Sequence, residues 1–354
     1  MGDATVFVEP HGDGHAIAVV KNQRIIELIV DSTKPSEKSL IGSVFSVKIG
    51  AFLSGINGTF VTLPNGAAGF LRGRKVNRNK PCTVVSVKVQ PEGDKAQPVS
   101  AGFALKGRYT ILTPFKPGIN FSRTIRDEEV KKYLRSELSG DLKKIPDKLG
   151  LIFRSMAEKA NSEQISEDIS KQMKIYDLIL NDPLMTPNVF VPPLKSRDVA
   201  FRDWINPDEK NFFEEESCFD RFGGWEKVHE FLLPQFKLSN GGTVIIEKTS
   251  ALIAVDINSG ADISRSTCLK TNLLAMSELP AQLQVRGLGG KIIIDFAPLS
   301  HKDRYRVSEE LLKCCKRDKV EIKIFGWTKS GCLEVQKKRD KPALSNILGD
   351  HKFL

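Results

Sequence analysis

The sequence predicts a multidomain α/β (α+β) protein, with a small β-barrel near the N-terminus and a layered α/β domain at the C-terminus. The chain has 354 residues, enough for two or three domains of ordinary size or for one large domain. Short β-like runs broken by glycine fill residues 39–106, which is typical of a small barrel. From residue 225 onward, strands and helices alternate in the order β-β-α-β-α-β, which indicates a layered α/β domain.

The first half of the chain is predicted to hold β-structure followed by helices. Apolar runs separated by turn residues predict strands before residue 107. Apolar residues at helical spacing predict two helices after residue 126, with Ser162 as the N-cap of the second. The expected elements are strands within 4–31 and 39–106, a strand at 108–115, helices at 127–138 and 162–180, and a short buried strand at 150–156.

The second half shows stronger patterns. A run of apolar residues in GGTVIIEKTSALIAVDIN predicts a hairpin of two strands at 241–258. The long amphipathic helix after it contains Pro280, and we expect a kink or a break there. The remaining expected elements are a helix that starts at 225 and ends near Pro234, the long helix at 264–287, a buried strand at 289–298, a helix at 302–318 and a strand at 320–327.

The charge balance favours a polyanionic partner. Lys and Arg number 53 against 43 Asp and Glu, which gives a net charge of +10. This excess is typical of nucleic-acid-binding proteins, but a solvated basic surface would look the same. No apolar run reaches the roughly 18 residues of a membrane span, and no secretory signal is visible, so we expect a cytoplasmic protein. The six cysteines form no C-x-x-C pair, which argues against a zinc site built from local ligands.

Two aspartates at the ends of apolar runs are the first candidates for chemistry. Asp256 closes ALIAVD, and Asp295 closes KIIID. Sites in open α/β sheets gather at the carboxyl ends of strands, and Asn258 faces the same side of its strand as Asp256. Two carboxylates and an amide oxygen suit Mg²⁺, which keeps several of its waters. The other interpretation is that two strand-end aspartates merely cap loops, and the residues alone leave both open.

The barrel segment carries aromatic and basic residues together. Phe60 and Phe70 lie on glycine-flanked strands, and residues 71–90 contain six Lys or Arg and no acidic residue. Such rings can stack on nucleobases while the cations neutralise phosphates, although both rings could instead belong to the barrel core. Arg154 follows a buried strand and could bind a phosphate or pair with a carboxylate. The cations nearest the rings, called the basic run here, are Arg72, Arg74, Lys75, Arg78 and Lys80.

Four motifs in a fixed order resemble the catalytic region of the ribonuclease E/G family of bacterial endoribonucleases. They are AVDINSG, KTNLLA, QVRGLGGKIIIDF and LEVQKKRDKPAL. Upstream, VFSVKIGAFLSGINGTFVTLPNGAAGFL is similar to the OB-type RNA-binding domain of that family. The segments GRYTIL, FSRTI and GLIFRSMAE are similar to its 5′-end sensing region.

The resemblance implies a domain order and a role for particular residues. It places Asp256 and Asp295 on the Mg²⁺ ligands and Asn258 on the residue that helps to place the attacking water. The implied RNA-contacting residues of the barrel are Phe60, Phe70 and Lys95, and the implied 5′-monophosphate pocket consists of Gly107, Ile111, Arg123, Arg154 and Ser155. The expected parts are an N-terminal β segment at 1–38, the OB-type domain at 39–106, the 5′-end sensing region at 107–180, a variable linker segment at 181–224 and the α/β catalytic domain at 225–354.

The sequence also departs from the family pattern. Ser155 stands where threonine is usual, and Glu321 stands where arginine is usual, which would reverse a charge near a bound phosphate. Ala297, Pro298 and Leu299 follow the IIIDF motif in place of the usual acidic residue. The C-x-x-C zinc link between protomers is missing, so we expect at most a homo-oligomer without that link.

These observations lead to one main hypothesis and two alternatives. The main hypothesis is an endoribonuclease that depends on Mg²⁺, cuts single-stranded RNA and leaves a 5′-phosphate on the downstream product. The first alternative is a non-catalytic RNA-binding protein that retains the ribonuclease E/G scaffold. The second is a metal-dependent DNase, which only the generic carboxylate site supports. Retention of both aspartates and of Asn258 favours the enzyme, and the departures favour the non-catalytic alternative.

Overall fold

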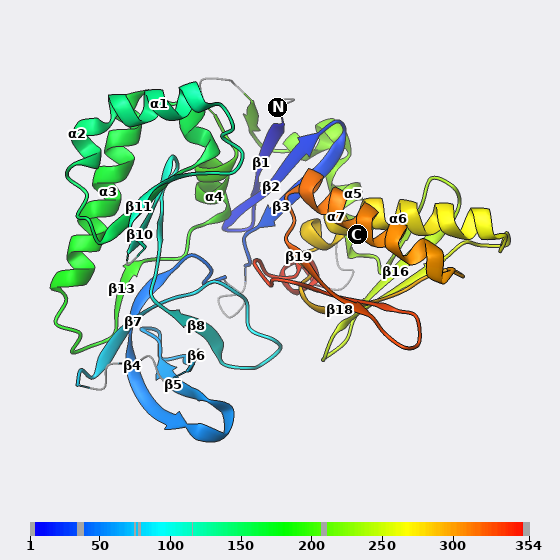
Figure 1. Ribbon diagram of the computed structural model, residues 1–354, viewed down its shortest axis with the longest axis horizontal. Helices are drawn as coiled ribbons and strands as arrows, with labels where there is room; N and C mark the ends of the chain where they lie inside the picture. The colour runs from blue at the N-terminus through cyan, green and yellow to red at the C-terminus, as the bar shows by residue number, and fades with distance from the viewer. Residues whose placement is uncertain are drawn as a thin grey trace. The chain divides into compact units, whose positions relative to one another are not determined.

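The chain forms two compact units. The first comprises Met1–Ser39, Lys195–Ala200 and Trp204–Leu354, and the second comprises Leu40–Leu194 and Phe201–Asp203. The structure, a computed structural model, describes residues 4–33, 39–73, 76, 79–114, 116–206 and 211–349 (Figure 1). Three cations of the basic run, Arg74, Lys75 and Arg78, therefore lie outside the described residues.

Five strands of the second unit close into a small barrel. Strand β4 pairs with both β5 and β7, so the order β4-β5-β6-β8-β7 returns to its first strand. Alternate side chains point inward, and the interior is filled by residues such as Phe45, Val61 and Val85. The predicted OB-type barrel is thus confirmed. Its strands are β4 (Val44–Leu53), β5 (Gly58–Thr62), β6 (Ala68–Arg72), β7 (Cys82–Ser86) and β8 (Gln97–Ala101), and β13 (Asn188–Val191) also pairs with β4.

A four-stranded sheet of the second unit packs against helix α3 (Ser162–Asn181). Buried residues recur every three to four positions along α3, among them Ile165, Ile169 and Ile179, and they form one apolar stripe. This stripe shares a core with Leu112 and Leu151 of the sheet. The sheet order is β11-β12-β10-β9, with β9 (Leu105–Lys106), β10 (Thr110–Pro114), β11 (Gly118–Phe121) and β12 (Leu149–Phe153).

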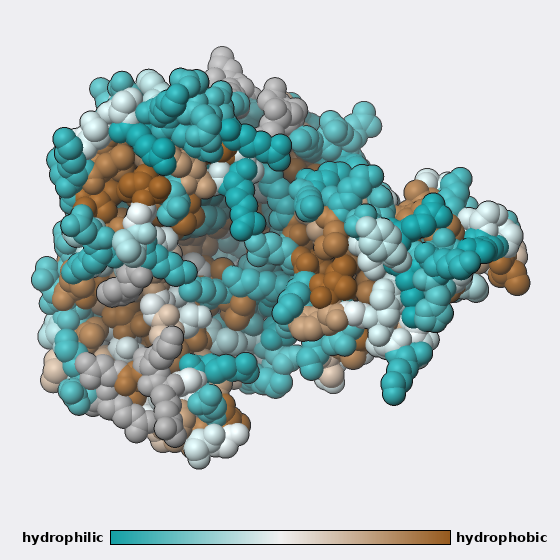
Figure 2. Space-filling view, in the orientation of Figure 1, coloured by the Kyte–Doolittle hydropathy of each residue, from teal (hydrophilic) through white to brown (hydrophobic). Residues whose placement is uncertain are grey.

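A pair of side-chain hydrogen bonds fixes the start of helix α3. The Asn161 side chain accepts a hydrogen bond from the backbone of Gln164, whose own side chain accepts one from the backbone of Asn161. The N-cap of α3 is therefore Asn161, and the predicted N-cap Ser162 is its first helical residue. Charged residues cover the outer surface of α1 (Glu128–Glu137), seen as the hydrophilic band at the upper left of Figure 2. The short helix α2 (Ser139–Leu142) follows it.

The first unit begins with three antiparallel strands joined by tight connections. Strands β1 (Thr5–His11), β2 (Gly14–Lys21) and β3 (Arg24–Val30) pair in sequence order. A tight turn joins β2 to β3, and Asn22 and Gln23 both have positive φ, as a two-residue hairpin turn requires. Strand β14 (Phe212–Glu214) completes this sheet by pairing in parallel with β1.

A six-stranded sheet forms the rest of the first unit and carries two helices on one face. Helices α6 (Arg265–Val285) and α7 (Arg304–Asp318) lie side by side (Figure 1). Their apolar residues pack on the inward side chains of the strands. Pro280 lies inside α6, which continues to Val285, so of the expected kink or break the break does not occur. The sheet order is β15-β16-β17-β18-β20-β19, with β15 (Gln235–Lys237), β16 (Thr243–Lys248), β17 (Ile253–Asn258), β18 (Gly290–Asp295), β19 (Ile322–Trp327) and β20 (Leu333–Lys337).

The segment at 181–224, expected to be a linker, contains regular elements. These are β13, helix α4 (Ser196–Asp203), β14 and a short 3-10 helix at Cys218–Phe222. Helix α5 (Gly224–Leu232) follows, and α8 (Leu344–Leu348) is the last described helix. In the described part of the chain, every helix is too short or too polar to cross a membrane. The overall class is mixed α/β, as the sequence predicts.

Candidate active site and anion-binding cluster

The two candidate metal ligands lie opposite each other on neighbouring strands. Strands β17 and β18 are parallel, and their register pairs Asp256 with Asp295. Inward residues such as Val255 and Ile294 belong to the core under α6 and α7, so both aspartates face the other, exposed side of the sheet. Asn258 is also exposed and faces the same side. The structure therefore brings all three predicted residues together.

Hydrogen bonds orient these carboxylates. Asn258 Nδ2 donates to Asp256 Oδ2 at 2.7 Å. The backbone N–H of Phe296 donates to Asp295 Oδ1 at 3.1 Å, and the Cys332 thiol lies 3.7 Å from the same oxygen. The sequence did not indicate that Cys332 lies beside Asp295, because no local pattern shows that β20 pairs with β18.

Two buried polar residues of α6 form hydrogen bonds at the same end of the strands as Asp256 and Asp295. Asn272 is fully buried, and its Nδ2 donates to the carbonyl of Ala297, two residues after Asp295. Its neighbour Thr271 accepts a hydrogen bond from Asn240, which precedes β16. The KTNLLA motif thus connects the helix to the loops on either side of the two carboxylates, a role that its apolar periodicity does not predict.

The donor set fits a hard cation that keeps its waters. Asp256 and Asp295 supply carboxylate oxygens, and Asn258 supplies an amide beside them. No group of three or more His, Cys, Asp or Glu able to hold a metal occurs among the described residues. Structural zinc sites need about four protein ligands, whereas Mg²⁺ is commonly held by one or two carboxylates. The donor set at the carboxyl ends of β17 and β18 is therefore suited to Mg²⁺ and unsuited to a structural zinc ion.

The two barrel phenylalanines form an exposed pair. Phe60 on β5 and Phe70 on β6 are cross-strand partners, with ring centroids 5.4 Å apart in an edge-on arrangement. Phe60 is 40% exposed, and Phe70 is half-buried. Gly58 makes room for the pair, because a Cβ there would come within 2.2 Å of the Phe70 ring. Both rings lie outside the barrel core, so the interpretation that they are core residues is wrong.

Lys95 lies in the loop before β8 and is strongly exposed. Its Nζ is 2.8 Å from Glu92 of the same loop. The loop leads into β8, where Gln97 pairs with Gly69, the residue before Phe70. In the described structure no contact joins Lys95 to either ring, so its predicted role rests on this proximity of strands alone.

The residues of the predicted 5′-phosphate pocket belong to the second unit, and Gly107 lies in the loop between β9 and β10. Ile111 on β10 pairs with Ile152 on β12, and Arg154 follows the end of β12. Arg154 Nη1 donates to the carbonyls of Gly107 at 2.6 Å and Arg108 at 3.0 Å. The structure therefore joins Arg154 to Gly107, from which it is separated by 47 residues in the sequence.

The backbones of the other two pocket residues, Ser155 and Arg123, lie near the end of β12. Ser155 follows Arg154 directly and begins a short 3-10 helix. Arg123 is exposed, and the N–H of the preceding Ser122 donates to the carbonyl of Phe153 at 2.7 Å. Among the described residues, no hydrogen bond or ion pair links the side chain of Arg123 or Ser155 to that of Arg154.

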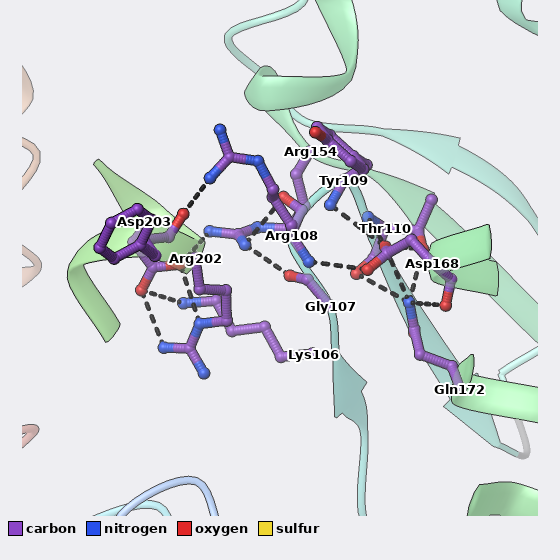
Figure 3. Close-up of polar contacts among 11 residues, drawn as sticks. Lys106, Gly107, Arg108, Tyr109, Thr110, Arg154, Asp168, Gln172, Arg202 and Asp203 are labelled. Atoms are coloured by element: carbon purple, nitrogen blue, oxygen red, sulfur yellow. Dashed lines mark hydrogen bonds and ion pairs between the residues drawn. The ribbon is translucent and has the colours of Figure 1, made fainter. Parts of the chain in front are cut away.

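A carboxylate that the sequence did not indicate lies at the centre of this cluster. Asp203 accepts hydrogen bonds from Arg154 Nη2 at 2.6 Å, from Lys106 Nζ at 3.0 Å and from Arg202 Nη2 at 2.8 Å (Figure 3). Arg154 is therefore paired with a carboxylate. The acidic residue that the sequence suggested near the pocket, Glu321, belongs to the first unit.

The environment of Asp203 holds it in the charged form. Burial alone would raise the pKa of this carboxyl, but the hydrogen bond from Arg202 and the charges of Lys106, Arg202 and Arg154 outweigh it. The net effect lowers the pKa of Asp203 far below its usual range. Burial lowers the pKa of Lys106, and Asp203 opposes that shift.

A second carboxylate shapes the loop that carries Gly107. Asp168 on α3 accepts hydrogen bonds from the backbone N–H groups of Arg108, Tyr109 and Thr110, at 2.9, 3.1 and 2.9 Å (Figure 3). A Cβ on Gly107 would lie 2.2 Å from Asp168 Oδ1, so any larger residue would force the Asp168 side chain to shift. The sequence did not indicate this role for Asp168, because the loop that it contacts is distant in the sequence.

The fold and its sites define a class: a two-unit α/β protein with an OB-type barrel and a pair of carboxylates at a sheet edge. The family model described as "Ribonuclease E/G family" matches residues 104–213 and 195–340. The chain belongs to the ribonuclease E/G family. It is 30% identical to ribonuclease E of Synechocystis over 75% of its own length, and 23% identical to ribonuclease G of Haemophilus influenzae over 94%.

The lengths of these relatives differ. The matched regions cover 45% of the Synechocystis protein, 44% of ribonuclease E of Nostoc and 79% of the Haemophilus protein. The chain thus spans less than half the length of the two ribonucleases E from these cyanobacteria. The residues that the family model matches include both carboxylates and the cations around Asp203.

Proposed function

We propose that this protein is an endoribonuclease that depends on Mg²⁺, cleaves single-stranded RNA and leaves a 5′-phosphate on the downstream product. The observation that carries the proposal is the register of β17 and β18, which places Asp256 opposite Asp295 on an exposed face. Membership of the ribonuclease E/G family supports RNA as the substrate. A role in RNA processing or decay follows from that activity.

The residues at the sheet edge have distinct tasks in this proposal. Asp256 and Asp295 would hold the ion, and Asn258 holds the Asp256 carboxylate in position through its hydrogen bond. When bound, Mg²⁺ polarises a phosphoryl oxygen and orients a water for attack. Water adds to phosphorus, the bond to the 3′ oxygen breaks, and the upstream product leaves with a 3′-hydroxyl.

The barrel would bind the RNA strand. Base–aromatic stacking tolerates every base, and the Phe60–Phe70 pair offers a partly exposed ring for it. The net charge of +10 provides the sequence-independent attraction to phosphates. Binding and cleavage would thus depend on different residues and can be measured separately.

The decisive experiment separates catalysis from binding. A 5′-monophosphorylated single-stranded oligoribonucleotide is incubated with the protein, with Mg²⁺ or with EDTA, and the product ends are identified. We expect cleavage only with Mg²⁺, and we expect Asp256→Asn and Asp295→Asn each to lower the rate about 100-fold or more while affinity changes little, because the ion supplies several kcal/mol. Asp13→Asn, in an exposed turn of the same unit, is the matched control.

Two outcomes would contradict the proposal. Wild-type turnover in either variant would show that the carboxylate pair is not the active site. Tight RNA binding without cleavage in Mg²⁺ would favour the non-catalytic RNA-binding alternative, which the missing acidic residue at Ala297 also favours.

A further inference from the structure

Lys106 lies on the same face of the small sheet as two residues of the phosphate pocket. The register of β9 and β10 pairs Lys106 with Ile111, and Ile111 pairs on its other side with Ile152. Arg154 follows Ile152 by two positions and therefore faces the same side. Lys106 and Arg154 thus flank Ile111 on the face opposite the core residue Leu112.

Asp203 holds these two cations together. Its carboxylate is 2.6 Å from Arg154 and 3.0 Å from Lys106, with Arg202 at 2.8 Å (Figure 3). Three positive charges around one negative charge leave the cluster with a net charge of about +2. A terminal phosphate monoester carries about −1.5 to −2 at neutral pH, whereas each internal phosphodiester carries −1. The cluster therefore matches the end of a nucleic acid strand better than its interior.

Both cations keep donors available for a ligand. A guanidinium has five N–H donors, and the described contacts of Arg154 engage three of them, with Gly107, Arg108 and Asp203. An ammonium has three donors, and the described contacts of Lys106 engage one, with Asp203. The Lys106 side chain is 41% exposed, against 15% for Arg154, so an incoming phosphate can reach it.

We propose that Lys106 is a further contact for a terminal phosphate monoester, alongside Arg154, and that Asp203 is the positioning residue that holds the two cations side by side. This inference rests on the proposed RNA function and deepens it. Without the Asp203 charge, the three cations repel one another, and the flexible Lys106 chain turns toward solvent. Asp203 then strengthens phosphate binding although its own charge is negative.

The test measures binding in EDTA, where no cleavage occurs. Two fluorescent single-stranded oligoribonucleotides of one sequence carry either a 5′-monophosphate or a 5′-hydroxyl, and anisotropy gives their affinities for the full chain. Wild type should prefer the monophosphate. Lys106→Gln should reduce that preference about tenfold, the value of one charge-assisted hydrogen bond, and Asp203→Asn at least as much. Affinity for the hydroxyl oligonucleotide should not change.

Matched variants separate positioning from general effects. Lys171→Gln and Asp141→Asn remove the same charges from exposed ion pairs of the same unit, and both should keep the preference. Asp203→Glu keeps the negative charge and should retain part of the preference for the monophosphate. Thermal melts report folding, and Lys106→Gln decides the proposal if Asp203→Asn does not fold.

The outcomes that overturn the inference are distinct from failure of the nuclease. Tighter monophosphate binding by Asp203→Asn would show that this carboxylate competes with the ligand. Equal losses for both oligonucleotides, or no monophosphate preference in wild type, would also overturn it. A wild type that prefers the monophosphate in EDTA but never cleaves with Mg²⁺ would contradict the proposed function and support the inference.

Discussion

At the residue scale, the surroundings of a carboxylate decide what it can do. Asp256 and Asp295 stand exposed at strand ends, with few protein partners. Asp203 is buried among three cations, and Asp168 is engaged by the backbone of a loop. The same functional group thus serves as a candidate metal ligand, as a counter-ion and as a loop anchor.

The first prediction concerns Asp203 and pH. Its folded pKa is lowered, because the charges and hydrogen bonds of its neighbours outweigh burial. Its stabilisation is therefore fully present above the unfolded pKa of about 3.9 and is lost as the pH falls toward the lower folded pKa. Asp203→Asn should cost about 2 kcal/mol in the free energy of unfolding at pH 7, because it leaves three cations without their counter-ion.

Urea denaturation at pH 7, 5 and 3 measures this effect. The difference between wild type and Asp203→Asn should be constant from pH 7 to 5 and should narrow at pH 3. Asp177→Asn on the exposed side of α3 serves as the control and should change stability little. A difference that grows on acidification would contradict the assigned direction of the pKa shift.

The second prediction concerns Phe60. Replacement by alanine should weaken single-stranded RNA binding by about 1–3 kcal/mol, because one base loses its stacking partner. The ring is 40% exposed, so the fold should change little. Filter binding and a thermal melt measure the two effects. Tyr133→Ala removes an exposed ring from α1 of the same unit and should leave RNA affinity unchanged.

At the scale of elements, helix α3 determines the conformation of the loop between β9 and β10. Asp168 and Gln172 are one helical turn apart and both reach the sheet. Gln172 accepts from the N–H of Leu112 at 2.7 Å and donates to Thr110 Oγ1 at 2.6 Å. The polar part of this helix therefore faces a strand, and its apolar stripe packs beside it.

The third prediction follows from the close approach of Asp168 to Gly107. Gly107→Ala places a Cβ within 2.2 Å of Asp168 Oδ1 and 2.5 Å of Gln172 Nε2, so both side chains must shift. We expect a loss of about 2 kcal/mol in the free energy of unfolding, typical of overpacking. Gly140→Ala in α2 meets nothing within 4 Å and should be neutral or slightly stabilising. Chemical denaturation of both variants checks this; equal effects would contradict it.

At the scale of the whole molecule, the excess of positive charge and the exposed aromatic pair would contribute to the proposed RNA binding in different ways. A charge of +10 would attract every phosphate, and salt would screen this attraction. Stacking on the barrel depends little on salt, because it involves uncharged rings. The two contributions can therefore be separated by ionic strength.

The fourth prediction uses that separation. The logarithm of RNA affinity should fall linearly with the logarithm of salt concentration, with a slope of about −0.7 for each phosphate neutralised. Replacing the exposed Arg72 with glutamine should reduce the slope by about 0.7 if its charge contacts one phosphate. Phe60→Ala should lower affinity without changing the slope. A slope that changes with Phe60 but not with Arg72 would contradict this division.

The sequence by itself determined most of the elements outside residues 181–224. Alternating apolar residues produced the strands of the barrel and of the six-stranded sheet, and helical spacing produced α1, α3 and α6, because both periodicities are local properties of the chain. It also placed Asp256 and Asp295 at strand ends. Of the two outcomes expected at Pro280, a kink or a break, the break does not occur, because α6 continues through this residue against a surrounding core.

Only the tertiary structure decided which of these residues meet. The alignment of Asp256 with Asp295 depends on strand register, and the closure of the barrel depends on the pairing of β4 with β7. Asp203 contacts Lys106 across 97 residues of sequence. Register and long-range ion pairs arise when distant segments pack, and no periodicity within one segment encodes them. The candidate catalytic residues therefore follow from the sequences of the strands, whereas their positions relative to one another follow from how the strands pack.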